Sequence, residues 1–336
     1  MKISEFNYNL SEKMIAKYPP KKRGTSNLLV LDKKSGDMQH RKYFNIPEYI
    51  KEGDIVVLNE TKVLNSRTFF LTPKGKKVEV LFLEDRGENT WFCLIGRAKN
   101  VKLSDILICE DIQIRVERRE ENGFLIEFVY GNAFDLFNRY GHTPLPPYMK
   151  RKDKQSDKER YNTVFSSIPG AVAAPTASLN LTEEILHEIE NKGGKIVKIE
   201  LRVGWGTFAP IREENIEEHQ IHKEYINVSH EACQSINECK GRVWAFGTTV
   251  ARALESAYSQ KERKLLSYFG YTDLYIYPGY EWRVVDVLVT NFHMPDSSLI
   301  LLVSSFAGKE SIKKAYEQAI DRGYKFLSYG DSMLIK

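Results

Sequence analysis

Four short apolar runs between Leu71 and Tyr130 constrain the fold of this chain more than any other feature. They cover residues 78–83, 91–95, 111–116 and 124–129, and Gly, Asn, Asp or charged residues separate them. No helical period occurs between the runs, so helices are not expected to connect them. Evenly spaced strands of this kind are typical of a small antiparallel sandwich or barrel. We therefore expect a self-contained β module.

The remainder of the chain alternates strands with amphipathic helices, which is the pattern of an α/β domain. Thr182 is expected to cap a helix that Gly193 and Gly194 end. A buried strand is expected before the β module, so the α/β domain should be built from both chain ends. We predict a mixed sheet with flanking helices (1–66 and 148–336) and an inserted small antiparallel β-barrel (67–147). The expected strands of the α/β domain are 54–59, 196–203, 243–246, 276, 284–285 and 287–289. Its later helices are expected to follow residue 247 and to cover 312–320.

Composition excludes several classes of protein. The chain has 336 residues, enough for about two domains, and its 42% hydrophobic and 28% charged residues are typical of globular proteins rather than disordered ones. A net charge of +4 is too small for a general polyanion binder, so any such site should be a local patch. No apolar run is long enough for a membrane span, and no secretory signal is evident at Met1. Four cysteines form no CxxC pair, so we expect a soluble, reduced, cytoplasmic protein: Cys93, Cys109, Cys233 and Cys239.

Two glycine-containing segments are candidate binding sites. Gly247, Thr248 and Thr249 follow a predicted strand and open a helix, where free N–H groups can bind a phosphate or carboxylate, although a simple turn and N-cap is the alternative. Residues 204–209 have the letters of a dinucleotide fingerprint, but Pro210 follows and no helix opens, so we reject a Rossmann interpretation. Trp205 and Phe208 there form either a substrate-stacking wall or ordinary packing.

Histidines provide candidates for metal binding and for acid–base chemistry. His219 and His222 lie three residues apart, but no third ligand is identifiable and zinc requires three or four, so surface or capping roles are equally expected. His293 follows a predicted buried strand, where site residues commonly lie in α/β sheets. A role in acid–base catalysis and a role in the core both remain open for His293.

A stiff proline-containing loop precedes a basic stretch. Pro144, Pro146 and Pro147 restrict the loop, and the stretch that follows has the composition of a nucleic-acid surface, with cations for phosphates and tyrosines for stacking. Acidic residues dilute its charge, so a solvated linker is the alternative. The basic and aromatic residues are Tyr148, Lys150, Arg151, Lys152, Lys154, Lys158, Arg160 and Tyr161.

Several segments together resemble one family, the S-adenosylmethionine:tRNA ribosyltransferase-isomerases of queuosine biosynthesis. Each match is weak singly, but they occur in family order and cover nearly the whole chain. They are residues 53–63 (GDIVVLNETKV), 140–142 (YGH), 144–148 (PLPPY), 170–177 (GAVAAPTA), 203–204 (VG), 206–208 (GTF), 247–249 (GTT) with Arg252, 278–280 (PGY), 290–293 (TNFH) and 328–331 (SYGD).

The resemblance implies both a fold and a reaction. The fold is a mixed α/β domain with a smaller inserted β-barrel. The reaction moves the ribosyl part of S-adenosylmethionine onto 7-aminomethyl-7-deazaguanine at the wobble position of a tRNA and rearranges it, giving epoxyqueuosine-tRNA, adenine and methionine. S-adenosylmethionine is then a co-substrate, no metal or other cofactor is needed, the partner is a tRNA anticodon stem-loop, and we expect a monomer.

The resemblance also assigns expected roles to individual residues. The candidate bases are His293, His142 and Asp286, since the sulfonium acidifies the neighbouring C5′ hydrogens and a base must take one of them. The tRNA contacts are Tyr148, Lys150, Arg151, Arg160 and Tyr161. The predicted contacts to S-adenosylmethionine are Pro175, Thr176, Gly247, Thr248, Thr249 and Arg252, of which the last four provide donors for its carboxylate.

One segment departs from the family pattern. Where the family usually reads Thr-Ala-Gly-Leu-His-Phe-Thr, this chain has Ser178 and Asn180 in place of the Gly and the His. Asn180 can form hydrogen bonds but cannot transfer a proton near neutral pH. Ser178 lacks the conformational freedom of glycine, which predicts a different loop shape. The change leaves two alternatives open, a paralogue acting on another deazapurine acceptor and a tRNA-binding protein without catalysis.

Overall fold

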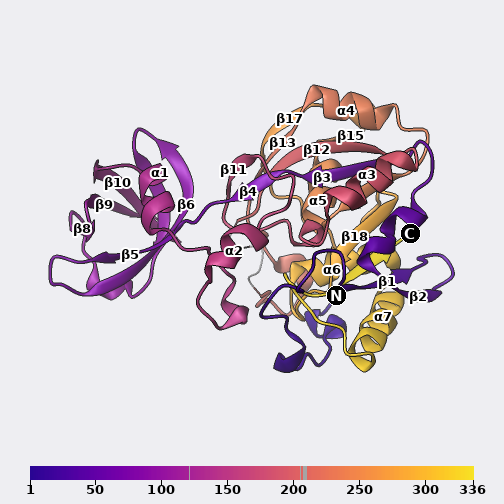
Figure 1. The fold of residues 1–336 in the computed structure, drawn as a ribbon, viewed down its shortest axis with the longest axis horizontal. Coiled ribbons are helices and arrows are strands. Elements are labelled where there is room, and N and C mark those ends of the chain that lie inside the picture. The colour runs from indigo at the N-terminus through magenta and orange to yellow at the C-terminus, as the bar shows by residue number, and fades with distance from the viewer. Residues whose placement is uncertain (121, 205, 207–209) are drawn as a thin grey trace.

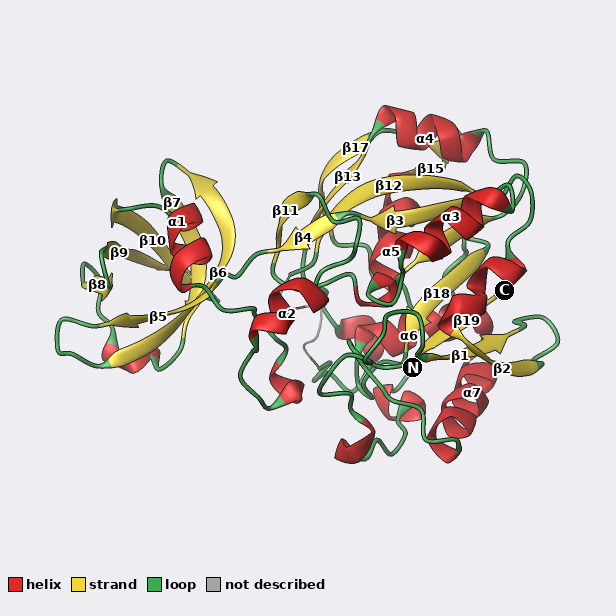
Figure 2. Cartoon of the chain, in the orientation of Figure 1, coloured by secondary structure: helices red, strands yellow, loops and turns green. Residues whose placement is uncertain are grey.

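The computed structural model describes residues 1–120, 122–204, 206 and 210–336, and they form a barrel and a larger sheet with helices (Figure 1; Figure 2). The predicted fold, a mixed α/β sheet with an inserted antiparallel barrel, is confirmed. The wall that we hypothesised on Trp205 and Phe208 lies outside the described residues. No helix in the described part of the chain combines the length and the apolar content that crossing a bilayer requires.

The barrel is closed and antiparallel, with strand order β10-β7-β6-β5-β8-β9. Side chains along each strand alternate between the inside and the outside of the barrel. In β6, for example, Val78, Val80 and Phe82 point into the core, whereas Glu79 between Val78 and Val80 does not. Helix α1 (Ala133–Tyr140), capped by the Asn132 side chain, packs against this core. The four predicted runs lie in β6, β7, β9 and β10, and two shorter strands were not predicted. The strands are β5 (Arg67–Leu71), β6 (Lys77–Gly87), β7 (Thr90–Ile95), β8 (Ile106–Cys109), β9 (Ile112–Glu120) and β10 (Gly123–Tyr130).

The larger sheet has nine strands in the order β17-β13-β12-β3-β14-β18-β19-β1-β2. Its centre is parallel, because β3 pairs in parallel with β12 and β14, and β14 with β18. The strands are β1 (Asn27–Leu31), β2 (Met38–Lys42), β3 (Ile55–Asn59), β12 (Lys195–Arg202), β13 (Glu224–Val228), β14 (Val243–Phe246), β17 (Tyr268–Thr272), β18 (Val287–Asn291) and β19 (Ser332–Ile335); short pairs are formed by β4 (Thr61–Val63) with β11 (Ile168–Ala171) and β15 (Tyr258–Ser259) with β16 (Lys264–Leu265).

Helices cover both faces of this sheet, as the alternation along β3 requires. Val56 and Leu58 join the core under α3 and η3, whereas Ile55 and Val57 join the core under α4, α5, α6 and α7. The α-helices are α2 (Gln155–Arg160), α3 (Glu183–Asn191), α4 (His230–Asn237), α5 (Thr248–Ala257), α6 (Ser298–Ala307) and α7 (Lys309–Asp321); the 3-10 helices are η1 (Ile3–Phe6), η2 (Glu12–Met14), η3 (Tyr43–Tyr49), η4 (Ala98–Asn100), η5 (Pro147–Met149), η6 (Thr176–Ser178) and η8 (Ile216–Glu218).

The strands expected at Ile276 and at 284–285 do not form. These residues lie in the connection between β17 and β18. The carboxylate of Glu255 on α5 accepts hydrogen bonds from the backbone N–H groups of Val284 at 3.0 Å and Val285 at 3.1 Å. A buried side chain therefore satisfies backbone groups that a neighbouring strand would otherwise pair.

Candidate active site

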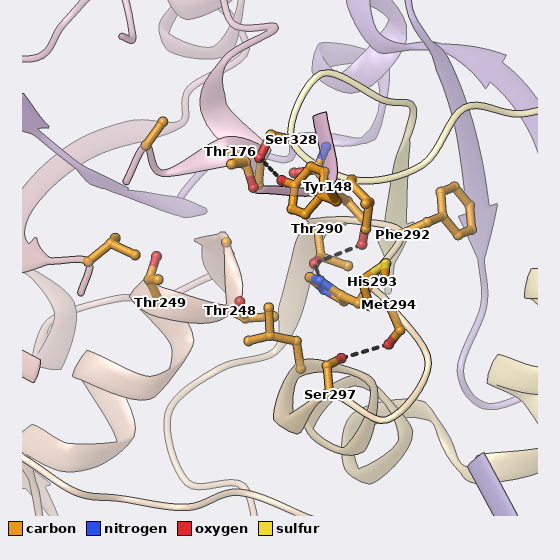
Figure 3. A pocket seen from close by; sticks show the side chains of 17 residues that line it. Tyr148, Thr176, Thr248, Thr249, Thr290, Phe292, His293, Met294, Ser297 and Ser328 are labelled. Atoms are coloured by element: carbon orange, nitrogen blue, oxygen red, sulfur yellow. Dashed lines mark hydrogen bonds between the residues drawn. The ribbon is translucent and has the colours of Figure 1, made fainter. Parts of the chain in front are cut away.

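A pocket lies where the parallel strands β14 and β18 end. Phe246 and Val289 are paired in register, and the N–H group of Gly247 donates to the carbonyl of Val289 at 2.8 Å. The segments at the carboxyl ends of the two strands, 247–249 and 290–293, therefore lie side by side and line the same cavity (Figure 3). We call this cavity the β14–β18 pocket. Its position at the carboxyl ends of parallel strands is where α/β sheets commonly hold ligands.

Helix α5 begins at the wall of this pocket. Gly247 precedes it with φ 113°, a left-handed conformation that favours glycine. No described side chain caps the first turn of α5, so its N–H groups are left for a ligand. Thr248 and Thr249 both line the pocket, and the Oγ1 atom of Thr249 is buried without a hydrogen-bond partner among the described residues. This turn has the properties of an anion site.

His293 faces α5 across the pocket (Figure 3). Its Nε2 atom lies 2.7 Å from Oγ1 of Thr290. Its backbone is held as well, because its N–H group donates to the Tyr316 hydroxyl at 3.0 Å and its carbonyl accepts from the Tyr8 hydroxyl. Burial lowers the pKa of His293 to about 3. The imidazole is therefore neutral near pH 7, and its position is fixed by three separate contacts.

The remaining walls come from η5, η6 and the segment before β19. Thr176 and Ala177 of η6 form one wall, and Tyr148 and Ser328 form another, with their hydroxyl oxygens 2.5 Å apart (Figure 3). Burial raises the pKa of Tyr148 to about 12, so the phenol stays protonated. No described residue that lines the pocket is Asp, Glu, Lys or Arg. The pocket consequently offers hydroxyl, amide, imidazole and backbone groups, but no charged side chain.

A second, wider cavity separates the barrel from the large sheet. We call it the interdomain cleft, and its volume is about 1060 Å³, against about 40 Å³ for the β14–β18 pocket. Trp91 of β7 and Phe134 of α1 line it on one side, and Arg202 and Tyr225 of the large sheet line it on the other. The two cavities share Val203. The β14–β18 pocket is therefore far smaller than the cleft, which is large enough for nucleotides.

Arg252 is not among the described residues that line the β14–β18 pocket, but it lines a smaller neighbouring cavity together with Thr248 and Thr249. Its guanidinium forms a buried ion pair with Glu224 and donates to the carbonyls of Leu274 at 2.9 Å, His222 at 3.0 Å and Thr272 at 3.1 Å. The N–H groups of Arg252, which we expected to bind a carboxylate ligand, are therefore already hydrogen-bonded to Glu224 and to these carbonyls. Arg252 therefore supports the structure behind α5.

Two of the three expected base candidates lie elsewhere. His142 is exposed beside the barrel, where its Nδ1 atom lies 2.9 Å from an oxygen of Asp153. Asp286 is exposed before the first residue of β18, at the opposite end of that strand from His293, and accepts from the N–H group of Val243 at 2.8 Å. The structure brings only His293 of these three residues into the pocket.

The predicted nucleic-acid residues serve mainly to hold the domain together. Arg151 contacts both carboxylate oxygens of Asp157, at 2.7 and 2.8 Å. Burial raises the pKa of Asp157, but hydrogen bonds from Arg151, the Lys154 N–H group and Tyr329 outweigh it and hold the pKa below its ordinary value. Tyr161 is fully buried against Tyr329, and Arg160 donates to the carbonyl of Pro20. Lys150 is exposed and paired with Glu12. Tyr148 lines the β14–β18 pocket. Asp157 therefore neutralises the charge of Arg151, which we had expected to face a phosphate backbone.

The other candidates take structural positions. His219 lies 2.9 Å from Glu213, and the described residues contain no group of three or more His, Cys, Asp or Glu side chains that could hold a metal. Pro175 is buried at the start of η6, next to Thr176 in the wall. Ser178 and Asn180 are buried outside the residues that line the pocket, and Ser178 fits a 3-10 helix without positive φ, so the serine causes no backbone strain there.

Sequence reasoning did not assign Asn291, Ser297 or Ser328 to the site, although all three line it. Asn291 and Ser328 stand in two of the segments that carry the family resemblance, and that signal could have identified them. Ser297 caps α6, since its Oγ accepts from the Ile300 N–H group at 3.3 Å. In the sequence, Ser297 could have been identified as a serine cap that directly precedes an apolar helix.

Comparisons with known proteins agree on one family. A family model described as queuosine biosynthesis protein matches residues 3–335. Curated proteins named S-adenosylmethionine:tRNA ribosyltransferase-isomerase from Chlorobaculum parvum and Aquifex aeolicus are 44% and 42% identical to the chain, and each match covers 100% of both sequences. A crystal structure of S-adenosylmethionine tRNA ribosyltransferase from Thermotoga maritima matches with a TM-score of 0.56 and 32% identity, covering 99% of this chain and 100% of that one.

Proposed function

The chain belongs to the queuosine biosynthesis protein family, and we propose on this premise that it is an S-adenosylmethionine:tRNA ribosyltransferase-isomerase. The enzyme transfers the ribosyl part of S-adenosylmethionine to 7-aminomethyl-7-deazaguanine at the wobble position of a tRNA and rearranges it. Epoxyqueuosine-tRNA, adenine and methionine are the products. The proposal includes action in the cytoplasm as a monomer, with S-adenosylmethionine as co-substrate and no resident cofactor.

One observation carries the assignment of the site. The β14–β18 pocket joins an uncapped helix N-terminus to a buried neutral histidine, in a chain whose full-length relatives carry that enzyme name. The N–H groups of α5 with Thr248 and Thr249 suit the carboxylate of the methionine end. Thr176 lines the opposite wall of the pocket, and Pro175 precedes Thr176 at the start of η6.

His293 is the base in this proposal. Its neutral imidazole offers a lone pair at physiological pH, although burial makes it a weaker base than a histidine in water. The proton that it takes is a C5′ hydrogen acidified by the adjacent sulfonium, while the aminomethyl nitrogen attacks and adenine departs. Thr290 positions the ring through its contact with Nε2.

The tRNA base enters from the interdomain cleft in this proposal. The cleft and the β14–β18 pocket share the lining residue Val203, and the cleft carries aromatic side chains on both walls, including Trp91 and Tyr225. The guanidinium of Arg202 lies over the Tyr225 ring at 4.7 Å. Aromatic faces and a cation of this kind stack nucleobases without reading a phosphate backbone. This assignment replaces the stretch from Lys150 to Tyr161 as the main tRNA contact.

The test is tRNA-dependent release of adenine from S-adenosylmethionine. Release should require tRNA that carries 7-aminomethyl-7-deazaguanine and should be absent with the same tRNA carrying unmodified guanine. Equal release with both tRNAs, or none with either, would contradict the proposal. The paralogue alternative has no support from Ser178 or Asn180, because neither is among the described residues that line the pocket.

A further inference from the structure

The two faces of strands β12, β13 and β17 differ in how far their side chains are exposed. On one face, Leu201 and Ile226 are fully buried in the core under α4 and α5. On the other face, Phe269 is 76% exposed and Tyr271 is 50% exposed. Both lie on β17, the edge strand of the larger sheet (Figure 1). Large aromatic side chains that gather exposed on one face are typical of a binding surface.

The strand register arranges the side chains of this face in two rows. Residues that pair directly across antiparallel strands share one face of a sheet. The first row is Arg202, Tyr225 and Tyr271, and the second row is Glu200, Asn227 and Phe269. In the first row, the ring centroids of Tyr225 and Tyr271 are 5.7 Å apart, and the guanidinium of Arg202 lies over the Tyr225 ring. We call Tyr225, Tyr271 and Phe269, together with Arg202, the aromatic platform.

The exposed charge at the aromatic platform is mainly positive. Side chains alternate along a strand, so Lys198 shares the platform's face of β12 with Arg202, and Lys223 lies on the same face directly before β13. All three cations are exposed. Of the acidic residues beside them, Glu200 is only 5% exposed and Asp273 is exposed. Three exposed cations against one exposed carboxylate favour a polyanion as the partner.

The aromatic platform continues out of the interdomain cleft. Arg202, Tyr225 and Tyr271 line the cleft, whereas Phe269 is not among the described residues that line it. The hydroxyl of Tyr271 donates to the carboxylate of Glu84 on β6, so Tyr271 also joins the platform to the barrel. Phe269 is two residues from Tyr271 along β17, a step of about 6.8 Å. A strand of RNA that leaves the cleft past Tyr271 therefore meets Phe269 next.

We propose that Phe269 stacks on an unpaired nucleotide of the tRNA anticodon loop next to the wobble nucleotide, an inference that rests on the proposed function. The wobble base occupies the cleft, its neighbour lies on the aromatic platform, and the cations face the phosphates of the loop. Proteins bind single-stranded RNA with aromatic side chains on a sheet face and with cations beside them. Stacking tolerates any base, so the platform holds the loop without selecting its sequence.

The test compares two RNAs, neither of which carries the modified base. One is an anticodon stem-loop with guanine at the wobble position, and the other is a blunt RNA duplex of the same length, which has no unpaired base. By fluorescence anisotropy, Phe269→Ala should weaken the stem-loop about tenfold, as expected for one stacked base, and leave the duplex unchanged. Phe269→Trp keeps a ring and should restore binding of the stem-loop. Unchanged binding of the stem-loop by Phe269→Ala would overturn the platform, as would an equal loss for both RNAs.

Phe44→Ala is the matched control. Phe44 is also an exposed phenylalanine, at 52%, but it lies in η3 and is not among the described residues that line the cleft. Its affinity for both RNAs should equal that of the unsubstituted protein. Phe269→Ala should also keep the salt dependence of stem-loop binding, because it removes no cation. A shallower salt dependence would show that phosphate contacts were lost instead and would overturn the stacking role.

Two further outcomes separate the aromatic platform from the proposed function and from self-association. Adenine release by the unsubstituted protein, with normal stem-loop binding by Phe269→Ala, would overturn the platform and leave the proposed function standing. No adenine release, with the predicted loss of stem-loop binding, would overturn the proposed function and support an RNA-binding platform. An edge strand can also pair with a second copy of the chain. Sedimentation as a dimer that Phe269→Ala dissociates would assign the face to that copy and overturn the platform.

Discussion

The Nε2 atom of His293 lies 2.7 Å from the Oγ1 atom of Thr290, three residues earlier in the chain. The same hydroxyl lies 3.2 Å from the carbonyl of Asn291, to which it donates. A hydroxyl that gives its only hydrogen to a carbonyl must accept from the imidazole. This pair therefore assigns the proton of His293 to Nε2 and leaves the Nδ1 lone pair as the acceptor.

Thr290→Val should impair catalysis more than binding. The change removes the partner of Nε2 and leaves that nitrogen unsatisfied, which should cost about 1–3 kcal/mol in unfolding free energy. We expect the rate constant for adenine release to fall about tenfold to a hundredfold, since the ring loses both its tautomer and its orientation. Thr290→Ser retains the hydroxyl and should recover most of the rate, and equal loss in both variants would contradict the assignment.

The stability of the protein should depend on pH through His293. Its pKa is about 3 in the folded protein and 6.5 ordinarily. Between these values the unfolded chain binds a proton that the folded chain does not, so the free energy of unfolding falls as the pH falls, by at most about 1.4 kcal/mol per pH unit from this group. Above pH 6.5 the group contributes no slope.

His293→Asn isolates that contribution. Urea unfolding of both proteins from pH 7 to pH 4 should show a shallower loss of stability in the variant. Parallel curves would show that His293 is not buried in its neutral form.

Gly247→Ala should weaken binding of S-adenosylmethionine. The φ of 113° is strained for alanine, and the new Cβ would lie 3.3 Å from Oγ1 of Thr249, so the turn before α5 must shift. Gly308→Ala is the control, because Gly308 also has a positive φ, 85°, with no atom within 4 Å of a new Cβ. Both variants should lose about 1–3 kcal/mol of stability, but only Gly247→Ala should raise the Kd, and an equal Kd in the two variants would contradict the pocket.

Arg252→Met should destabilise the fold and not the complex. Removing the cation leaves Glu224 buried without its ion-pair partner, which should lower the free energy of unfolding by about 3–5 kcal/mol. Arg283→Met breaks an exposed pair with Glu281 and should cost less than about 1 kcal/mol. The Kd for S-adenosylmethionine of folded Arg252→Met protein should stay within a few-fold of normal, whereas a hundredfold rise would return Arg252 to the site.

The sequence predicts the elements better than it predicts the partners of individual side chains. Runs with period two locate β6, β7, β9 and β10, and the Gly247 turn locates the start of α5, because these features depend on nearby residues. The short strand β8 has too few residues for a period to appear. The ion pair of Arg252 with Glu224 was not predicted, because Glu224 is 28 positions away and no local pattern shows that the sheet brings the two residues together.

The mass of the wobble nucleoside after reaction is the most direct test of the proposed function. Purified protein is incubated with S-adenosylmethionine and tRNA carrying 7-aminomethyl-7-deazaguanine, and the digested tRNA is analysed by mass spectrometry. We expect a nucleoside heavier by the transferred ribosyl unit, with adenine and methionine released in equal amounts. An unchanged nucleoside, although both substrates bind, would contradict it.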